Sequence, residues 1–145
     1  MKVRDAMTAD VALASPQDTL REAAQRMLSY DIGALPVGDG DRLVGMLTDR
    51  DIAVRAIAAG LGPDTRVGDV MSCEVKYCFD DDSLGDVAAN MGDLQLRRLP
   101  VLDRDKRLVG IISLSDVANF ERSQVTGRAM ANVCMPGGAH SQVAH

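Results

Sequence analysis

Apolar and polar positions follow the same pattern twice along the chain. Matching positions lie 64 residues apart at first, and 65 residues apart after a one-residue insertion in the segment 103–106. Matched pairs include Val3 and Val67, Met7 and Met71, Leu20 and Leu84, Met27 and Met91, and the Leu-Pro-Val triplets that begin at Leu35 and Leu99. A period of this length that occurs only twice indicates two copies of a small domain. We therefore place one copy in residues 1–62 and the other in residues 63–125.

Each copy has the periodicities of a β-α-β-β-α unit that follows a short lead-in helix. In the first copy we expect a lead-in helix over 3–7, strands over 11–14, through Pro36-Val37 and over 43–47, a hairpin turn at 39–41 and a closing helix that ends at Gly60. The first long helix begins at a Thr19–Glu22 capping box, and Ser83 begins its counterpart. Apolar residues of the first long helix are predicted to form one buried face: Leu20, Ala23, Ala24, Met27 and Leu28.

A seven-residue frame marks the point in each copy where the last strand meets the last helix. It consists of a glycine, two apolar residues, a hydroxyl residue and, three positions later, an aspartate, and it spans residues 45–51 and 110–116. We call Thr48–Asp51 the first junction and Ser113–Asp116 the second junction.

Two interpretations of the junctions use the same side chains. In one, the hydroxyl and the aspartate form a capping box, and the junction only starts a helix. In the other, the hydroxyl and the free helix N–H groups contact a phosphate, while the aspartate accepts both hydroxyls of a ribose. One copy alone favours the capping box, whereas two copies at matched places favour the ligand site.

The composition argues against nucleic acid and membranes as partners. The chain has 145 residues, is 46% hydrophobic and carries a formal charge of −5 at pH 7. Acidic and basic residues are spread evenly over both copies, so no basic face is predicted. The sequence has no apolar run long enough to predict a membrane span. Its N-terminus carries Lys2, Arg4 and Asp5 without a following apolar stretch, so it does not resemble a secretory signal. We therefore expect a cytoplasmic protein.

Residues that could carry catalysis or bind a metal are few. The cysteines Cys73, Cys78 and Cys134 form no C-x-x-C pair and are predicted to be free thiols. The histidines, His140 and His145, lie in the C-terminal tail and match no zinc pattern. No serine or cysteine has a recognisable base nearby. We therefore predict no catalytic residue, no metal site, no required cofactor and no enzyme activity.

The apolar-Pro-Val strand and the G-x-x-[ST]-x-x-D junction of each copy resemble those of a tandem pair of CBS domains, a family named after cystathionine β-synthase. The resemblance covers residues 1 to about 122. The runs 32–37 and 47–52 are similar to those of small stand-alone bacterial CBS proteins that include the hypoxic response type. The resemblance implies an α+β fold, in which two β-α-β-β-α units pack by their sheets about a pseudo-two-fold axis. It also implies that AMP, ADP, ATP, NAD or S-adenosylmethionine binds in clefts between the units.

The resemblance implies which residues contact this ligand. By position, Thr48 and Ser113 contact phosphate, and Asp51 and Asp116 contact ribose. The backbone of two segments is expected to line the adenine pockets: Ala34, Leu35 and Pro36 in the first copy, and Arg98, Leu99 and Pro100 in the second.

Two further residues keep two interpretations each. Arg50 either reaches a phosphate or belongs to a solvated ion pair, and Tyr77 either stacks on a ring or is an ordinary strand aromatic. Arg97-Arg98 in the second copy replaces Gly33-Ala34 in the first, so we do not expect the two sites to be equivalent.

We favour a regulatory ligand-sensing module whose occupancy by an adenosine nucleotide changes its conformation or assembly. The alternative is an interaction or dimerisation protein with no bound nucleotide. We expect a homodimer, because the helix faces that end at Ile57 and Phe120 are apolar, and an unidentified protein partner in trans. The tail, residues 126–145, is predicted to be flexible, and its apolar Met130, Val133 and Met135 either dock on a partner protomer or belong to a frayed end.

Overall fold

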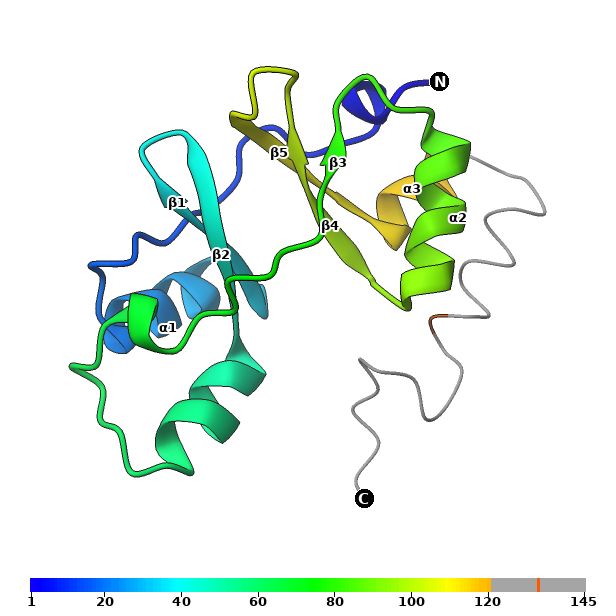
Figure 1. The fold of residues 1–145 in the computed structure, drawn as a ribbon. Coiled ribbons are helices and arrows are strands. Elements are labelled where there is room, and N and C mark those ends of the chain that lie inside the picture. Colours follow the sequence, from blue (N-terminus) through cyan, green and yellow to red (C-terminus); the bar gives the residue numbers. More distant parts are fainter. Residues whose placement is uncertain (121–132, 134–145) are drawn as a thin grey trace. The chain divides into compact units, whose positions relative to one another are not determined.

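The structure is a computed structural model that describes residues 1–120 and residue 133 (Figure 1). The predicted tail, residues 126–145, lies outside this described part except for Val133. The predictions for Cys134, for both histidines and for Met130 and Met135 therefore fall outside it as well.

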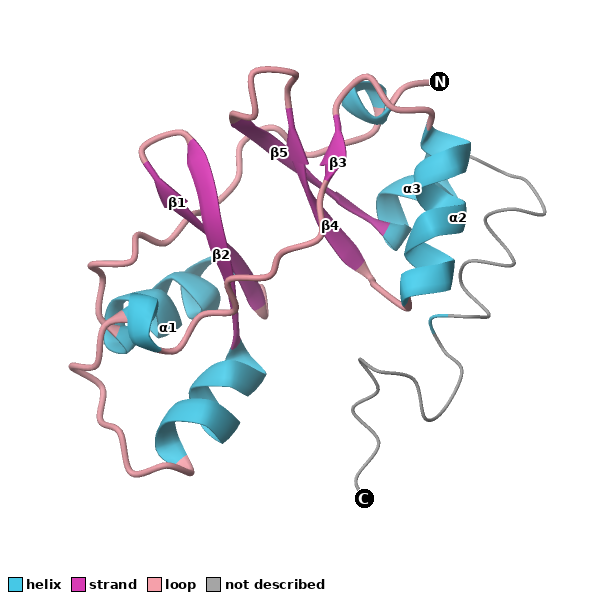
Figure 2. Ribbon diagram, in the orientation of Figure 1, coloured by secondary structure: helices cyan, strands magenta, loops and turns pink. Residues whose placement is uncertain are grey.

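Helices and strands alternate in two repeated units, which confirms the predicted α+β class (Figure 2). The elements of the first copy are η1 (Val3–Asp5), α1 (Leu20–Tyr30), β1 (Ala34–Asp39), β2 (Arg42–Thr48) and η2 (Asp51–Ile57). The elements of the second copy are η3 (Val67–Asp69), β3 (Cys78–Phe79), α2 (Leu84–Leu94), β4 (Arg98–Leu102), β5 (Leu108–Ser113) and α3 (Leu114–Phe120). Both η1 and η3 are single 3-10 turns at the predicted lead-in positions. No helix among the described residues is long and apolar enough to cross a membrane.

The chain divides into two compact units, and each unit contains the first segment of the other sequence copy. The α1 unit comprises Val11–Val75 with Lys106–Leu108, and the α2 unit comprises Met1–Asp10, Lys76–Asp105 and the described residues from Val109 on. Each 3-10 turn therefore belongs to the unit built on the other sequence copy. The compact units are therefore not divided at the boundary that we predicted between residues 62 and 63 for the two sequence copies.

In the α1 unit, α1 packs on the antiparallel hairpin β1–β2. The core includes Leu20, Ala23 and Met27 from α1, Leu35, Val37 and Leu47 from the hairpin, and Val67 and Val70 from the η3 segment. The predicted Thr19–Glu22 capping box is present: the Glu22 N–H donates to the Thr19 hydroxyl at 3.2 Å, and the Thr19 N–H donates to the Glu22 carboxylate at 3.3 Å.

In the α2 unit, α2 and α3 pack on a three-stranded sheet of order β3-β4-β5, in which β3 runs parallel to β4 (Figure 1). Its core includes Leu84, Val87, Ala88 and Met91 from α2, Leu99, Val101 and Ile112 from the sheet, Val117 from α3, and Val3 and Ala6 from the N-terminal segment. Met27 is buried, as predicted, and so is its counterpart Met91.

Three predictions for the first copy were wrong in detail. The predicted strand over 11–14 is only an isolated bridge between Ala14 and Val37. The predicted closing helix is present as η2, but it ends at Ile57 rather than at Gly60, and it is a π-helix in which the Ala58 N–H donates to the Ala53 carbonyl five residues earlier. On α1, Leu28 is 83% exposed and Ala24 is also exposed. A two-stranded hairpin covers only a narrow stripe of this helix, whereas the wider sheet covers five positions of α2.

Candidate functional site

The first junction forms where β2 ends and η2 begins. The Thr48 N–H donates to Asp51 Oδ2 at 2.9 Å, and the Asp51 N–H donates to Thr48 Oγ1 at 3.1 Å. The Asp51 side chain is 15% exposed, and its Oδ1 lies 4.0 Å from an Arg55 guanidinium nitrogen. This geometry is a reciprocal capping box.

The second junction repeats this geometry where β5 meets α3. The Ser113 N–H donates to Asp116 Oδ2 at 3.0 Å, and the Asp116 N–H donates to Ser113 Oγ at 3.2 Å. Both side chains are partly buried. The position that corresponds to Arg55 is Phe120, so within residues 1–120 the second aspartate has no counterpart of the Asp51–Arg55 ion pair.

Capping leaves the atoms that a ligand would need without a protein hydrogen-bond partner in the described part of the chain, although Asp51 Oδ1 also faces Arg55 at 4.0 Å. The cap uses a lone pair of each hydroxyl oxygen and the Oδ2 of each aspartate. A hydroxyl also has one donor hydrogen, and an ionised carboxylate has four lone-pair sites. The hydroxyl hydrogen can donate to a phosphate oxygen, and Oδ1 can accept from a sugar hydroxyl. The capping box and the ligand site are therefore compatible.

Each junction is joined to the start of the proline strand of its own unit. The Asp49 N–H donates to the Gly33 carbonyl at 2.9 Å, and Ala34 lies opposite Thr48 in the β1–β2 pair. In the α2 unit, the Leu114 N–H donates to the Arg97 carbonyl at 3.0 Å. The fold thus brings the predicted phosphate and ribose residues close to the segments predicted to contact adenine.

The proline segments can offer a ligand mainly backbone groups. Leu35 and Leu99 are at most 1% exposed and belong to the two cores, and Pro36 and Pro100 are buried. Ala34 is partly buried, and Arg98 is exposed. This is consistent with the expectation that backbone, rather than side chains, lines an adenine pocket.

The charges next to the two junctions differ. The Asp49 carboxylate lies over Gly33, where an added Cβ would be 2.9 Å from its Oδ2. At the second junction the corresponding positions are Leu114 and Arg97, and both Arg97 and Arg98 are exposed. Arg50 beside the first junction is also exposed. The second junction therefore has the more positive surroundings.

Tyr77 lies just before β3 and makes an aromatic contact within its own segment. Its ring and that of Phe79 are 5.6 Å apart and almost perpendicular, and Tyr77 is 40% exposed. The Arg104 guanidinium lies over the Phe79 ring, with its Cζ 4.1 Å from the ring centroid. Arg104 donates from Nε to both carboxylate oxygens of Asp81 at 2.9 and 3.0 Å, and this hydrogen bonding lowers the pKa of Asp81. The sequence did not predict this contact, because Arg104 and Asp81 lie 23 positions apart and no local periodicity joins them.

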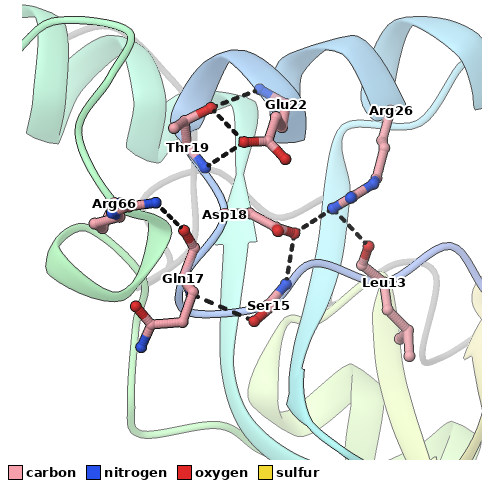
Figure 3. A network of polar contacts seen from close by, with 8 residues as sticks. All are labelled: Leu13, Ser15, Gln17, Asp18, Thr19, Glu22, Arg26 and Arg66. Carbon is pink, nitrogen blue, oxygen red and sulfur yellow. Dashed lines mark hydrogen bonds and ion pairs between the residues drawn. The ribbon is translucent and has the colours of Figure 1, made fainter.

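A polar network ties the loop before α1 to the helix (Figure 3). Asp18 Oδ2 accepts from the Ser15 N–H at 2.8 Å and from Arg26, and the same Arg26 nitrogen donates to the Leu13 carbonyl at 3.2 Å. Burial acts to raise the pKa of Asp18, but the hydrogen bonds from Arg26 and Ser15 outweigh it, so the pKa lies below its usual value. In the second copy Asp82 makes the matching bond to the Phe79 N–H at 2.9 Å, while Asn90 replaces Arg26.

The part of the chain that the structure describes offers little metal or thiol chemistry. Within it, no group of three or more His, Cys, Asp or Glu side chains could hold a metal ion. Burial, with a smaller effect of Asp82, raises the pKa of the Cys78 thiol to about 12, so this thiol stays protonated near neutral pH. Cys73 is a free, exposed thiol.

Two curated relatives are similar to nearly the whole chain. The family model for the CBS domain matches residues 3–57 and 67–123. The CBS domain-containing protein YhcV of Bacillus subtilis is 43% identical over 132 residues, which cover 90% of this chain and 94% of YhcV. Hypoxic response protein 1 of Mycobacterium tuberculosis is 40% identical over 135 residues, which cover 92% of this chain and 94% of that protein.

Solved structures share the fold. The crystal structure of Hypoxic Response Protein I with two coordinated zinc ions is 42% identical, with a TM-score of 0.76 over 84% of this chain and 100% of that chain. The CBS domain pair of MJ0100, in complex with 5′-methylthioadenosine and S-adenosyl-L-methionine, is 28% identical, with a TM-score of 0.71 over 82% of this chain and 94% of that chain. CBSX2 in complex with AMP is 28% identical, with a TM-score of 0.71 over 81% of this chain and 93% of that chain.

Proposed function

Because the chain belongs to the CBS domain family, we propose that it is a regulatory module that binds an adenosine compound at its two junctions. Binding changes the conformation or the assembly of the protein, which acts without catalysis in the cytoplasm. The ligand is a regulator and not a cofactor. AMP, ADP, ATP and NAD are the nucleotides we consider.

One observation carries this proposal. Both units hold a hydroxyl and an aspartate in the same reciprocal geometry, with hydrogen bonds of 2.9–3.2 Å, at the same strand-to-helix step. In each unit a backbone hydrogen bond joins this step to the start of the proline strand. The same few groups are therefore positioned twice.

The ligands of two related structures support the adenosine class. CBSX2 was solved with AMP, and the MJ0100 pair with 5′-methylthioadenosine and S-adenosyl-L-methionine. These molecules share an adenosine moiety and differ in the group at its 5′ position. The shared moiety contains the ribose diol that Asp51 and Asp116 are proposed to bind, so the aspartates are suited to all three.

The second candidate is an interaction or dimerisation protein without a nucleotide. The complete capping boxes favour it, since they account for both junctions without a ligand. Exposed apolar side chains also favour it: Leu28 is 83% exposed, Tyr30 65%, Ile57 58% and Phe120 51%. A homodimer is compatible with either candidate, as is a protein partner in trans.

Calorimetric titration of purified, nucleotide-free protein separates the two candidates. AMP, ADP, ATP, NAD and S-adenosyl-L-methionine are titrated in turn, with guanosine monophosphate as the control for base recognition. The proposal expects saturable binding of at least one adenosine compound, and no binding of the guanosine control. Absence of binding by all five compounds, in protein shown by native mass spectrometry to carry no retained ligand, would favour the interaction protein.

A further inference from the structure

The glycine that begins each frame permits a close approach by the other sequence copy. A Cβ at Gly110 would lie 2.7 Å from both the Met7 Sδ and the Thr8 carbonyl oxygen. A Cβ at Gly45 would lie 2.5 Å from the Met71 Sδ and 2.9 Å from the carbonyl oxygen of the next residue, Ser72. Real Cβ atoms do not occupy such positions, so any side chain at either glycine would displace the approaching segment.

Backbone hydrogen bonds join the approaching segment to the frame strand. Thr8 and Ile111 exchange two bonds of 2.9 Å, and Ser72 and Met46 do the same. Ile111 lies two residues before the hydroxyl of the second junction, and Met46 lies two residues before that of the first. Each segment therefore adds a short antiparallel contact to the strand that ends at a junction.

The segments are also anchored in the cores of these units. Val3 is fully buried in the core of the α2 unit, and Val67 is fully buried in that of the α1 unit. The Val3 and Arg4 N–H groups donate to the carbonyls of Asp82 and Asp80 at 3.0 and 2.9 Å. The N-terminal residues of the first copy thus belong structurally to the second junction, and residues 67–72 belong to the first.

We infer that Thr8 and Ser72 are positioning residues that set the ligand affinity of the junction formed by the opposite sequence copy. This inference rests on the proposed function, since it assumes a ligand at the junctions. Ser113 can meet a ligand only where the end of β5 places it, and two residues earlier β5 is paired to Thr8. Loss of that pair lets the strand end move, and a displacement of about 1 Å is enough to weaken a positioned polar contact. Ser72 has the same relation to Thr48 through Met46.

The test measures AMP affinity by calorimetry in two single-site backgrounds, Asp51→Asn and Asp116→Asn. Thr8→Pro removes the N–H that donates to Ile111, while Thr8→Val keeps it. In the Asp51→Asn background, Thr8→Pro should weaken AMP binding by about fivefold or more, the factor for one lost hydrogen bond. Thr8→Val and the neighbouring Ala9→Pro should stay within about twofold of the background protein.

The mirror experiment uses the other background. With Asp116→Asn, Ser72→Pro should weaken AMP binding by the same factor, while Cys73→Pro and Thr8→Pro should not. A simple loss of stability would not produce this crossed pattern in variants whose circular dichroism remains native. Equal effects of Thr8→Pro at both junctions, or no effect at the second, would overturn the inference.

Two further experiments test the inference if the proline variants do not fold: a milder substitution, and a hydrogen-exchange measurement in which Thr8 and Ser72 are unchanged. Gly110→Ala should weaken the second site alone, by pushing Thr8 away from β5. Hydrogen exchange of the Asp51→Asn protein should show that AMP slows exchange at the Thr8 and Ile111 amides. If AMP binds and neither amide is protected, the inference fails while the proposed function stands. If AMP and the other adenosine compounds do not bind the unmodified protein, both fail.

Discussion

An aspartate-to-asparagine change at each junction separates capping from ligand binding. Asparagine keeps one carbonyl oxygen, which can accept from the Ser113 N–H in place of Asp116 Oδ2, now 3.0 Å from that nitrogen. Its other terminal atom is an amide nitrogen, which donates and cannot accept from a ribose hydroxyl. Asp116→Asn should therefore retain the cap and lose the ribose contact, whereas Asp116→Ala should lose both.

The expected magnitudes follow from these atoms. A hydrogen bond to a charged group contributes about 1.5–3 kcal/mol, so AMP affinity at the second site should fall about 10- to 150-fold in both variants. Loss of a cap costs about 0.5–2 kcal/mol of unfolding free energy, so Asp116→Ala should be destabilised by that amount, and Asp116→Asn by a few tenths. At the first junction Asp51→Asn also loses the charge opposite Arg55, which at 4.0 Å adds only about 0.3 kcal/mol.

The assay combines calorimetric titration of AMP with urea unfolding of each variant. Asp10→Asn, at an exposed loop position, controls for the change in net charge. Unchanged AMP affinity in the double variant Asp51→Asn with Asp116→Asn would refute the ribose assignment. Equal destabilisation by Asp116→Asn and Asp116→Ala would refute the assignment of the capping atoms.

Three further predictions concern assembly, ligand charge and pH. Light scattering at micromolar concentration should give a homodimer, because apolar side chains at Ile57 and Phe120 remain 58% and 51% exposed in the single chain; a mass near 15.5 kDa with and without nucleotide would contradict it. ATP should bind more tightly at the second junction than at the first, since Arg97 and Arg98 make the surroundings of the second junction more positive. Calorimetry on Asp51→Asn and Asp116→Asn should show this order, and the reverse order of ATP affinities would rule it out. Arg26→Met should lower the unfolding free energy by about 1 kcal/mol near pH 7, because Asp18 loses its charged partner. Because the pKa of Asp18 is lowered by folding, its stabilising effect is present above the unfolded pKa of about 3.9 and is lost as pH falls through the folded value. In urea titrations, the difference in unfolding free energy between Arg26→Met and the unmodified protein should therefore shrink below about pH 4. A difference that is independent of pH down to about 2 would exclude this cause.

The predictions that held depend on residues close together in the chain. The Thr19–Glu22 box and the capping boxes at both junctions join residues three positions apart, and their hydrogen bonds are satisfied locally. The ligand contacts of the junction residues stay a prediction. The hairpin turn at 39–41 is local as well, and α2 starts after Ser83 as predicted, although the Ser83 side chain makes no capping hydrogen bond. Because the same local signals occur twice, the sequence by itself determined the two repeated units, their α+β class and the family to which they belong.

Tertiary structure decided which copy completes which unit. The bonds of Thr8 with Ile111 and of Ser72 with Met46 join different copies, and no local periodicity encodes such pairs. Burial was decided at the same level: Leu28 has the spacing of a core residue but stays exposed, because the two-stranded hairpin beneath α1 is too narrow to cover it. The glycines of the frame were visible in the sequence as repeated residues, but the reason for them lies in backbone that approaches from the other copy, and only the folded chain brings that backbone within contact distance.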